Sequence, residues 1–126
     1  MRYKFRGKMT TGQWVYGLLS EDRPNSTAYY DKCKYRISWF GEDGAEYNAP
    51  VLTETVGQFT GKLDKNKTEI CEHDIVLMEN QKHKVVYVED YAMYMLELEK
   101  HYRIGLIEYE SDELEIIGNI HEVSHV

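Results

Sequence analysis

The sequence predicts an all-β fold built from several coiled antiparallel sheets. Short runs that alternate apolar and polar residues follow one another along most of the chain, which is the spacing of half-buried strands. Clusters of Gly, Asn, Asp and Ser separate these runs, as turns do in small barrels and sandwiches. The 126 residues fit one domain with a hydrophobic core, and neither an internal repeat nor a linker divides them.

The N-terminal part, over about residues 1–50, is predicted to be a β-hairpin region. Residues 3–6 alternate aromatic and basic side chains, residues 9–12 form a turn, and residues 13–19 resume as a strand. In that second strand Trp14, Tyr16 and Leu18 share one face.

Two further strands are expected before residue 50. A loop at residues 21–26 leads to a short strand at 27–30, and residues 35–40 alternate as a longer strand. The turn at residues 41–44 follows, and Ala49-Pro50 marks a strand edge or entry point.

The most informative stretch runs from Thr55 to Met78 and predicts two β segments joined by a polar turn. A strand at residues 56–61 precedes a turn whose apex we place at Asn66, because Asn tolerates a left-handed backbone. A buried strand follows at residues 75–78, and Asp74 before it is expected to bond the backbone of the turn.

This stretch also carries a family resemblance. Residues 56–76, V-G-Q-F-T-G-K-L-D-K-N-K-T-E-I-C-E-H-D-I-V, resemble the hallmark of the YopX family of phages and prophages of Gram-positive bacteria. That family reads Q-Y-T-G, L-K-D-K-N-G-K-E-I and Y-E-G-D-I-V. Residues 4–17 resemble its opening hairpin, and I-I-G-N-I-H-E at 116–122 resembles its closing I-G-N-I-Y-E. The resemblance implies one YopX-like domain over residues 1–126, with a Src-homology-3-like small barrel over about 51–122.

The chain departs from the family pattern at four places. Lys67 and His73 replace glycines, which puts the special backbone angles of those positions in question. Cys71 replaces an aromatic residue, and Lys62-Leu63 reverses the family's Leu-Lys.

The remaining strands are expected at residues 84–88, 92–98, 103–109 and 114–120. Residues 79–82 read as a hairpin-type loop. Residues 92–98 are rich in helix formers and fit either a strand or a helix, and their alternation after a short turn favours the strand.

Composition limits the classes of partner and compartment. The chain has 15 Lys and Arg against 22 Asp and Glu, a net charge of −7, which disfavours wrapping nucleic acid but leaves room for a local basic patch. It lacks an apolar run of about 18 residues that would span a membrane, and the charged N-terminus has no apolar segment behind it. We therefore expect a protein of the host bacterial cytoplasm, with Cys33 and Cys71 as reduced thiols.

Two kinds of polar cluster are candidate sites, and each has a plainer structural reading. The lysines at 62, 65 and 67, and the Lys82-His83-Lys84 group, would contact a nucleic-acid backbone or simply decorate turns. The acidic cluster around His73 and Asp74 would serve metal or acid–base chemistry, or cap turns.

His121 and His125 lie four residues apart in the C-terminal tail without a helix to align them. The sequence has no phosphate loop or nucleophile elbow, and we predict no cofactor.

The leading hypothesis is a non-enzymatic phage accessory protein that binds a protein partner or itself. Exposed aromatic side chains are the expected contact surface: Trp14, Tyr16, Tyr29, Tyr30 and Trp39. A nucleic-acid-binding small barrel and a metal-dependent enzyme centred on His73 and Asp74 are the alternatives. The residues predicted to contribute to binding are Trp14, Tyr16, Trp39, Lys62, Lys65, Lys67, His73 and Asp74.

Overall fold

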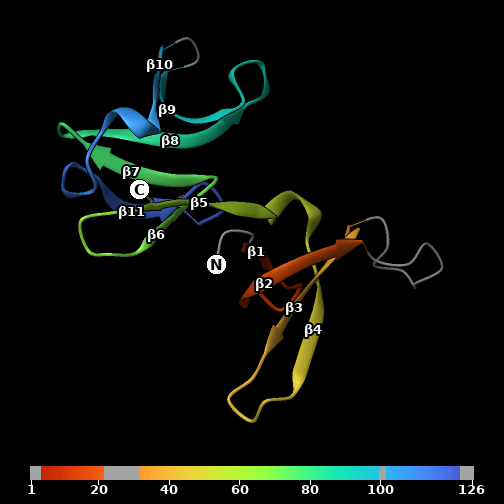
Figure 1. Cartoon of the computed structure of the whole chain (residues 1–126). Coiled ribbons are helices and arrows are strands. Elements are labelled where there is room, and N and C mark those ends of the chain that lie inside the picture. Colours follow the sequence, from red (N-terminus) through yellow and green to blue (C-terminus); the bar gives the residue numbers. More distant parts are fainter. Residues whose placement is uncertain (1–3, 22–31, 100–101, 123–126) are drawn as a thin grey trace. The chain divides into compact units, whose positions relative to one another are not determined.

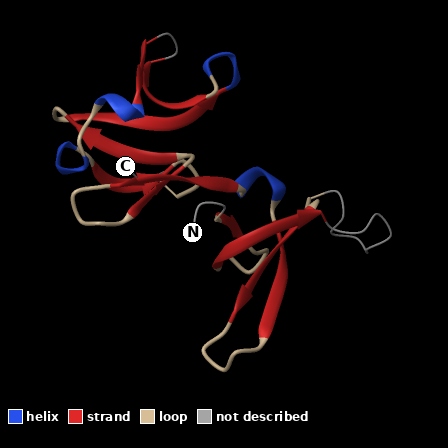
Figure 2. Ribbon diagram, viewed as in Figure 1, coloured by secondary structure: helices blue, strands red, loops and turns tan. Residues whose placement is uncertain are grey.

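The computed structural model describes residues 4–21, 32–99 and 102–122, and it is mainly β. In these residues the chain forms eleven antiparallel strands, β1 to β11, and the helical segments are single 3₁₀ turns (Figures 1 and 2). The chain divides into two compact units, Met1–Gln58 and Phe59–Val126. We describe each unit by itself.

The first unit is an antiparallel sheet in the order β4-β3-β2-β1-β5 (Figure 1). Its elements are β1 (Phe5–Lys8), β2 (Trp14–Glu21), β3 (Tyr35–Phe40), β4 (Glu46–Val51), the 3₁₀ turn η1 (Thr53–Thr55) and the first residues of β5 (Gly57–Leu63). Val15, Ile37 and Val51 form its core, because alternation places them on the same side of their strands. The hairpin predicted for residues 3–19 and the strand predicted for 35–40 are confirmed.

One strand of this sheet, β4, is not among the strands predicted from the sequence. Residues 46–51 form β4, whose exposed half, Glu46 to Asn48, lacks the apolar alternation that marks a strand. Pro50 lies in β4 at the edge of the sheet, where the missing backbone N–H removes no bond to a further strand. The predicted strand at 27–30, and the predicted loop at 21–26 apart from Glu21, lie outside the described residues.

A close backbone approach holds the two halves of β2 in different pairings. The first half pairs with β1, with Phe5 opposite Gly17, and the second half pairs with β3, with Leu18 opposite Ser38. A Cβ at Gly17 would lie 2.0 Å from the carbonyl oxygen of Ser38. The switch of partner therefore requires glycine at this position.

The second unit is built on a five-stranded sheet in the order β10-β9-β8-β7-β11 (Figure 1). Its strands are the remainder of β5, β6 (Glu69–Cys71), β7 (Asp74–Met78), β8 (Gln81–Val88), β9 (Met93–Glu99), β10 (Tyr102–Gly105) and β11 (Glu115–Asn119). The 3₁₀ turns are η2 (Glu89–Tyr91), η3 (Leu106–Glu108) and η4 (Ser111–Glu113). The core comprises Ile70, Val76, Met78, Val85, Leu96, Leu106 and Leu114. Both cysteines, Cys33 in the first unit and Cys71 here, are buried.

The structure decides several open points in this unit. Residues 93–99 form a strand, as the alternation predicts. The predicted loop at 79–82 is shorter: only Glu79 and Asn80 turn, both with a left-handed backbone, which is the pattern of a tight two-residue hairpin. The strand predicted for 103–109 ends at Gly105, where η3 begins.

The predicted Src-homology-3-like barrel is not confirmed. In the described residues β10 and β11 are the two edges of the five-stranded sheet, which is open rather than closed. Sequence patterns do not predict whether a sheet closes into a barrel, because closure depends on the shear and tilt of strands that are far apart in the chain. The relation to such barrels stays a prediction.

Replacing Gly17 with Ala is expected to lower the free energy of unfolding by about 3 kcal/mol or more, because a backbone atom, not a flexible side chain, meets the new Cβ. The matched control is Gly105→Ala, where the nearest atom to a new Cβ is 3.6 Å away. Urea denaturation followed by circular dichroism measures both. Equal stability of the two variants would show that β2 does not approach β3 this closely.

Candidate functional site

The turn between β5 and β6 is organised by the carboxylate of Asp64. Its Oδ1 accepts hydrogen bonds from the backbone N–H groups of Asn66 and Thr68, each at 2.9 Å. Its Oδ2 accepts a third from the N–H of Ile116 in β11, at 3.0 Å. The backbone N–H of Lys65 also donates to the carbonyl of Leu114, at 2.8 Å. Asp64 therefore joins the hallmark turn to the closing strand, two segments some fifty residues apart in sequence.

The charge of Asp64 is stabilised although the side chain is buried. Burial by itself would raise the pKa of this carboxyl, but the three backbone N–H donors and the nearby Lys65 outweigh it and hold the pKa below its ordinary value of 3.8. Lys65 also lies 3.4 Å from Glu115, measured from Nζ to Oε1. Its role here is to neutralise carboxylates of its own chain.

The two positions at which the family has glycine keep a left-handed backbone in this chain. Lys67 has φ 65° and His73 has φ 77°. Our placement of the left-handed apex at Asn66 is therefore wrong: the apex is Lys67, the next residue, because the Asp64 carboxylate fixes the N–H groups on either side of it. A side chain other than Gly, Asn or Asp is strained in this region.

Asp74 and His73 serve the turn that follows β6. The buried Asp74 Oδ2 accepts from the N–H of Cys71 at 2.7 Å, which confirms the predicted bond to the turn. The ring of His73 meets that of His121 edge to face, with centroids 5.4 Å apart, and its Nε2 lies 3.8 Å from Glu72. Within the described residues no group of three or more His, Cys, Asp or Glu is placed to hold a metal ion.

A second candidate site is the face of the first sheet that points away from its core, which we call the outer face. Opposite residues in antiparallel strands share a side of the sheet, so the pairs Lys8–Trp14 and Arg6–Tyr16 lie together on it. The guanidinium of Arg6 lies 5.1 Å from the ring centroid of Trp14, and Nζ of Lys8 lies 5.9 Å from it. These are cation–π distances.

The outer face exposes large apolar side chains. Phe40 is 73% exposed, and Tyr16 and Leu18 are each 50% exposed. Arg36 and Asn48 also share this face, with Arg36 donating to the Asn48 side chain. Glu46 is the one acidic residue among the described residues of the outer face; its cations are Lys8, Arg36 and Arg6, of which Arg6 is largely buried at 9% exposure. The surface is apolar and positively charged.

Trp39 does not lie with Trp14 and Tyr16. It alternates with Ser38 and Phe40 and packs against the core on the inner side of the sheet. Its ring stacks on Tyr47 with centroids 6.1 Å apart, and the Tyr47 hydroxyl donates to Asp43 at 2.7 Å. That hydrogen bond lowers the pKa of Asp43. Trp39 therefore supports the β3–β4 hairpin, and Tyr29 and Tyr30 lie outside the described residues.

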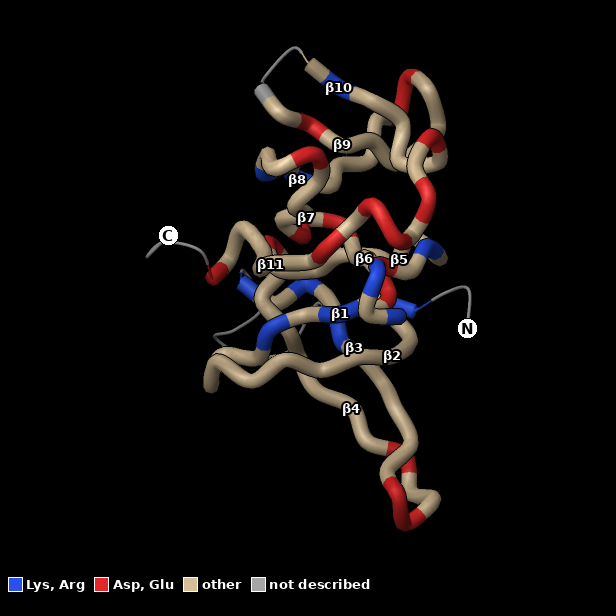
Figure 3. The backbone as a smooth tube through the Cα atoms, turned by 90° about the vertical axis from the view of Figure 1, so that its left-hand side faces the viewer, with Lys and Arg blue, Asp and Glu red and all other residues tan. Residues whose placement is uncertain are grey.

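The acidic character of the chain belongs almost entirely to the second unit. The first unit has eight basic residues against seven acidic ones, whereas the second has seven against fifteen. In Figure 3 basic residues mark β1, and acidic residues mark many turns of the second unit. The net charge of −7 therefore says little about the outer face, because it averages a near-neutral unit with a strongly acidic one.

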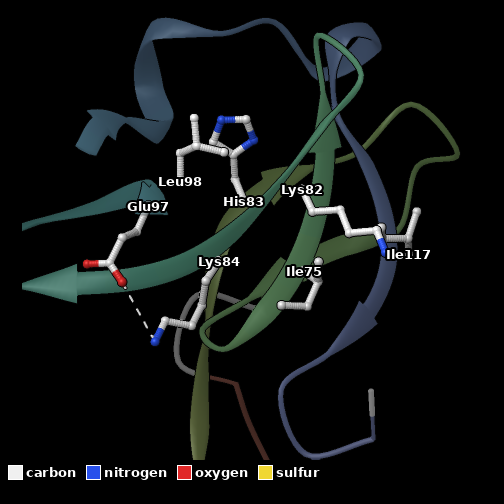
Figure 4. Close-up of a pocket in the computed structure, with 7 residues that line it drawn as sticks. All are labelled: Ile75, Lys82, His83, Lys84, Glu97, Leu98 and Ile117. Carbon is white, nitrogen blue, oxygen red and sulfur yellow. Dashed lines mark ion pairs between the residues drawn. The ribbon is translucent and has the colours of Figure 1, made fainter. Parts of the chain in front are cut away.

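Two pockets in the described part of the second unit are large enough to hold a small molecule. One of about 450 Å³ is lined by Lys62 and Thr60 and by apolar residues that include Met93 and Leu106. Tyr94 also lines it, and burial, with Glu72 and Cys71 nearby, raises the pKa of this tyrosine to about 12. The other, of about 250 Å³, lies over β7, β8, β9 and β11 (Figure 4).

The predicted basic groups are not single clusters. Lys62 borders the larger pocket, Lys65 meets Glu115, and Lys67 is the left-handed residue of the turn. In the other group, Lys82 and Lys84 share a face of β8, but His83 points to the opposite side and is buried (Figure 4).

Two features of these sites are not among the predictions from the sequence. The role of Asp64 is not among the predictions from the sequence, although an Asp that precedes Asn and Lys in a turn signals side-chain bonds to the next N–H groups. The alternation of residues 35–40 predicts a strand, but it does not say which side of the sheet Arg36 and Phe40 occupy. That side follows only from the register of β3 with its neighbours. None of the helical segments in the described residues is long and apolar enough to cross a membrane.

Comparison with known families supports the motif resemblance. The family model described as YopX protein matches residues 4–126, which includes both units and all three motif regions. A comparison with curated proteins finds no match.

Replacing Asp64 with Asn is expected to lower the free energy of unfolding at pH 7 by about 2–4 kcal/mol, because an amide has one acceptor oxygen and no charge, so the charge-assisted bonds to three part-buried backbone N–H groups are lost or weakened. The folded pKa lies below the unfolded one, so this contribution is complete above about pH 4 and is lost as the pH falls through the folded pKa. Urea titrations from pH 7 to pH 2 test both points. The exposed Asp112→Asn is the control, and an equal acid slope in wild type and Asp64→Asn would contradict the assignment.

Replacing Lys67 with Gly is expected to raise the free energy of unfolding by about 0.5–1 kcal/mol, because Gly removes the left-handed strain. Lys65→Gly is the matched control in the same turn. Lys65 is not among the left-handed residues, so its replacement should lower stability by a similar amount. Thermal unfolding of the two variants gives opposite shifts if the turn has this conformation, and shifts of the same sign would refute it.

Proposed function

The chain belongs to the YopX protein family, and from that premise we propose that it is a non-enzymatic module that binds an acidic protein partner. The observation that carries the proposal is the outer face, on which exposed apolar side chains lie beside the cations Lys8 and Arg36 and the largely buried Arg6. The role that fits this surface and the phage and prophage origin of the resembling family is an accessory protein in the cytoplasm of a bacterial host.

The composition of the outer face is that of a protein-binding surface. Tyr, Trp and Arg are the residue types that contribute most binding energy at protein interfaces. Contiguous exposed apolar side chains such as Tyr16, Leu18 and Phe40 are unfavourable in water and gain free energy when a partner covers them.

Charge complementarity selects the kind of partner. Arg6 and Lys8 flank Trp14, and Arg36 lies on the same side of the sheet, opposed only by Glu46 among the described residues of the face. An acidic partner would associate faster and in a preferred orientation, because its charges would be attracted by these cations.

A metal-dependent enzyme centred on His73 and Asp74 draws no support from the geometry. The Asp74 carboxylate accepts a backbone hydrogen bond in a buried turn, and His73 packs on His121. A site for acid–base or metal chemistry needs these groups to converge on an accessible point.

The specific test is an affinity capture from phage-infected host lysate treated with nuclease, followed by titration of the captured protein. Tyr16→Ser and Phe40→Ser are each expected to raise the Kd roughly tenfold or more, since each removes an exposed apolar contact. Tyr91→Ser is the control, because Tyr91 is 66% exposed and lies in the second unit. A partner that binds all three variants alike would refute the outer face as the contact surface.

The second candidate is a nucleic-acid-binding module, and the cations that flank Trp14 in the first unit are the observation that favours it. Bases stack on aromatic side chains while Lys and Arg contact phosphates. In a Trp39→Phe background, Trp14 fluorescence would then change on adding a single-stranded oligonucleotide. For each phosphate contact, the logarithm of the binding constant would fall by about 0.7 for a tenfold rise in salt concentration. An unchanged spectrum removes this candidate.

Self-association is the third outcome that the experiments distinguish. In the described part of the chain, the edge strands β4 and β10 present backbone groups that a second copy could pair with. Light scattering at increasing protein concentration measures the mass, and the same Tyr16 and Phe40 variants show whether the outer face is the contact.

A further inference from the structure

We infer that the smaller pocket of the second unit binds a small organic anion: a carboxylate or phosphate group on a short aliphatic body. We call it the anion pocket. It lies over β7, β8, β9 and β11, in a different unit from the outer face. It therefore adds a small-molecule site to the proposed protein-binding function and does not depend on it.

The size of the anion pocket suits a small molecule. Its volume is about 250 Å³. At ~30 Å³ for each displaced water this is room for roughly eight waters, less than the 300–1,000 Å³ typical of larger ligands. A molecule of roughly ten non-hydrogen atoms fits this space, whereas a nucleotide does not.

Two lysines on one face of β8 supply the positive charge. Lys82 and Lys84 are two residues apart in the strand, so both side chains point to the same side. Figure 4 shows them on the side of β8 occupied by Ile75 and Ile117, with His83 and Leu98 on the other side. Lys84 lies opposite Ile75 in the register, which places the charge beside an apolar wall.

The charges in the pocket do not cancel. Glu97 accepts a hydrogen bond from Nε of Arg103 at 2.8 Å, and its other oxygen lies 3.7 Å from Nζ of Lys84. The shorter contact with Arg103 satisfies the carboxylate, so Lys84 is held only loosely. The ammonium group of Lys82 makes no ion pair with the described part of the chain. The pocket lining thus has two lysines against one carboxylate, which also pairs with Arg103 outside the lining. The second unit as a whole has fifteen acidic residues against seven basic ones.

An irregularity in β11 supplies the apolar wall. Ile116 pairs with Val76 and Gly118 pairs with Ile75, so Ile117 between them has no partner in β7. A bulge of this kind redirects a side chain, and it leaves Ile117 lining the pocket at 41% exposure. Ile117 lies in the closing motif that resembles the family pattern.

These features together define the ligand class. Lys ammonium groups act as compact positive charges and accept either carboxylate or phosphate. Ile75 and Ile117 favour an aliphatic body next to that group, because its burial removes apolar surface from water. The pocket should therefore prefer an amphipathic anion over an inorganic ion or an uncharged alcohol.

The test is a titration of the isotope-labelled full chain followed by ¹H–¹⁵N NMR. The probes are hexanoate and butyl phosphate. The control probes are hexanol, which lacks the negative charge, and inorganic phosphate, which lacks the aliphatic chain. We expect saturable shifts of amides in β8 and β11, and a Kd for the better amphipathic anion at least tenfold below that of either control probe.

Two variants separate the contributions of charge and apolar wall. Lys82→Gln should weaken amphipathic-anion binding at least fivefold, whereas Lys62→Gln, a matched lysine outside the anion pocket, should not. Ile117→Ser should remove the preference for butyl phosphate over inorganic phosphate. All three positions are on the surface or half-buried, so native-like spectra verify the fold before titration.

Three results would overturn the inference. Equal affinity for butyl phosphate and inorganic phosphate would indicate a nonspecific anion contact. An equal effect of the Lys82 and Lys62 substitutions would mean that the pocket does not select the ligand. Shifts confined to residues outside β7, β8, β9 and β11 would place binding elsewhere. Failure of the protein-partner experiment would leave these titrations unchanged, because the Tyr16 and Phe40 variants keep the anion pocket.

Discussion

The carboxylate of Asp64 is the interaction on which the second unit depends. It accepts three backbone hydrogen bonds, two from its own turn and one from β11. The turn thereby fixes where the last strand begins, and β11 then pairs with β7 and completes the edge of the five-stranded sheet. Removing the carboxylate would leave three part-buried backbone N–H groups without their acceptor in the chain. This link explains why the hallmark turn and the closing motif occur together: neither segment is fully hydrogen-bonded without the other.

The same anchoring accounts for the two residues in left-handed conformation where the family has glycine. A lysine or histidine would choose another backbone angle in a free peptide. In this chain, Asp64 holds the N–H groups around Lys67, and the buried Asp74 holds the turn that contains His73. The carbonyl of His73 also accepts from Ile120, and its N–H donates to Val85. The surrounding hydrogen bonds fix the backbone, so the side chain changes while the conformation stays.

The two surfaces available for binding differ in chemistry because alternation distributes the side chains differently in the two units. In the first unit the inner side of the sheet takes the aliphatic core, and the outer face keeps aromatic and basic residues. In the second unit the core lies on one side of β8, and the lysines on the other side meet the irregular Ile117 of β11. A broad apolar face suits a macromolecule, and a small charged hollow suits a small anion. One chain thus presents two surfaces of unlike chemistry on separate units.

The sequence by itself determined the strand-rich class, most strand positions, the family and the role of Asp74, because these depend on local alternation, turn residues and short motifs. It also placed Trp14 and Tyr16 together on one face, since both lie in one strand. Only the tertiary structure decided that Trp39 supports the hairpin, that Lys82 and Lys84 face Ile117, and that Asp64 reaches Ile116. Each of these depends on register or on contacts between segments far apart in the chain, and a one-residue change of register would move every side chain to the opposite face.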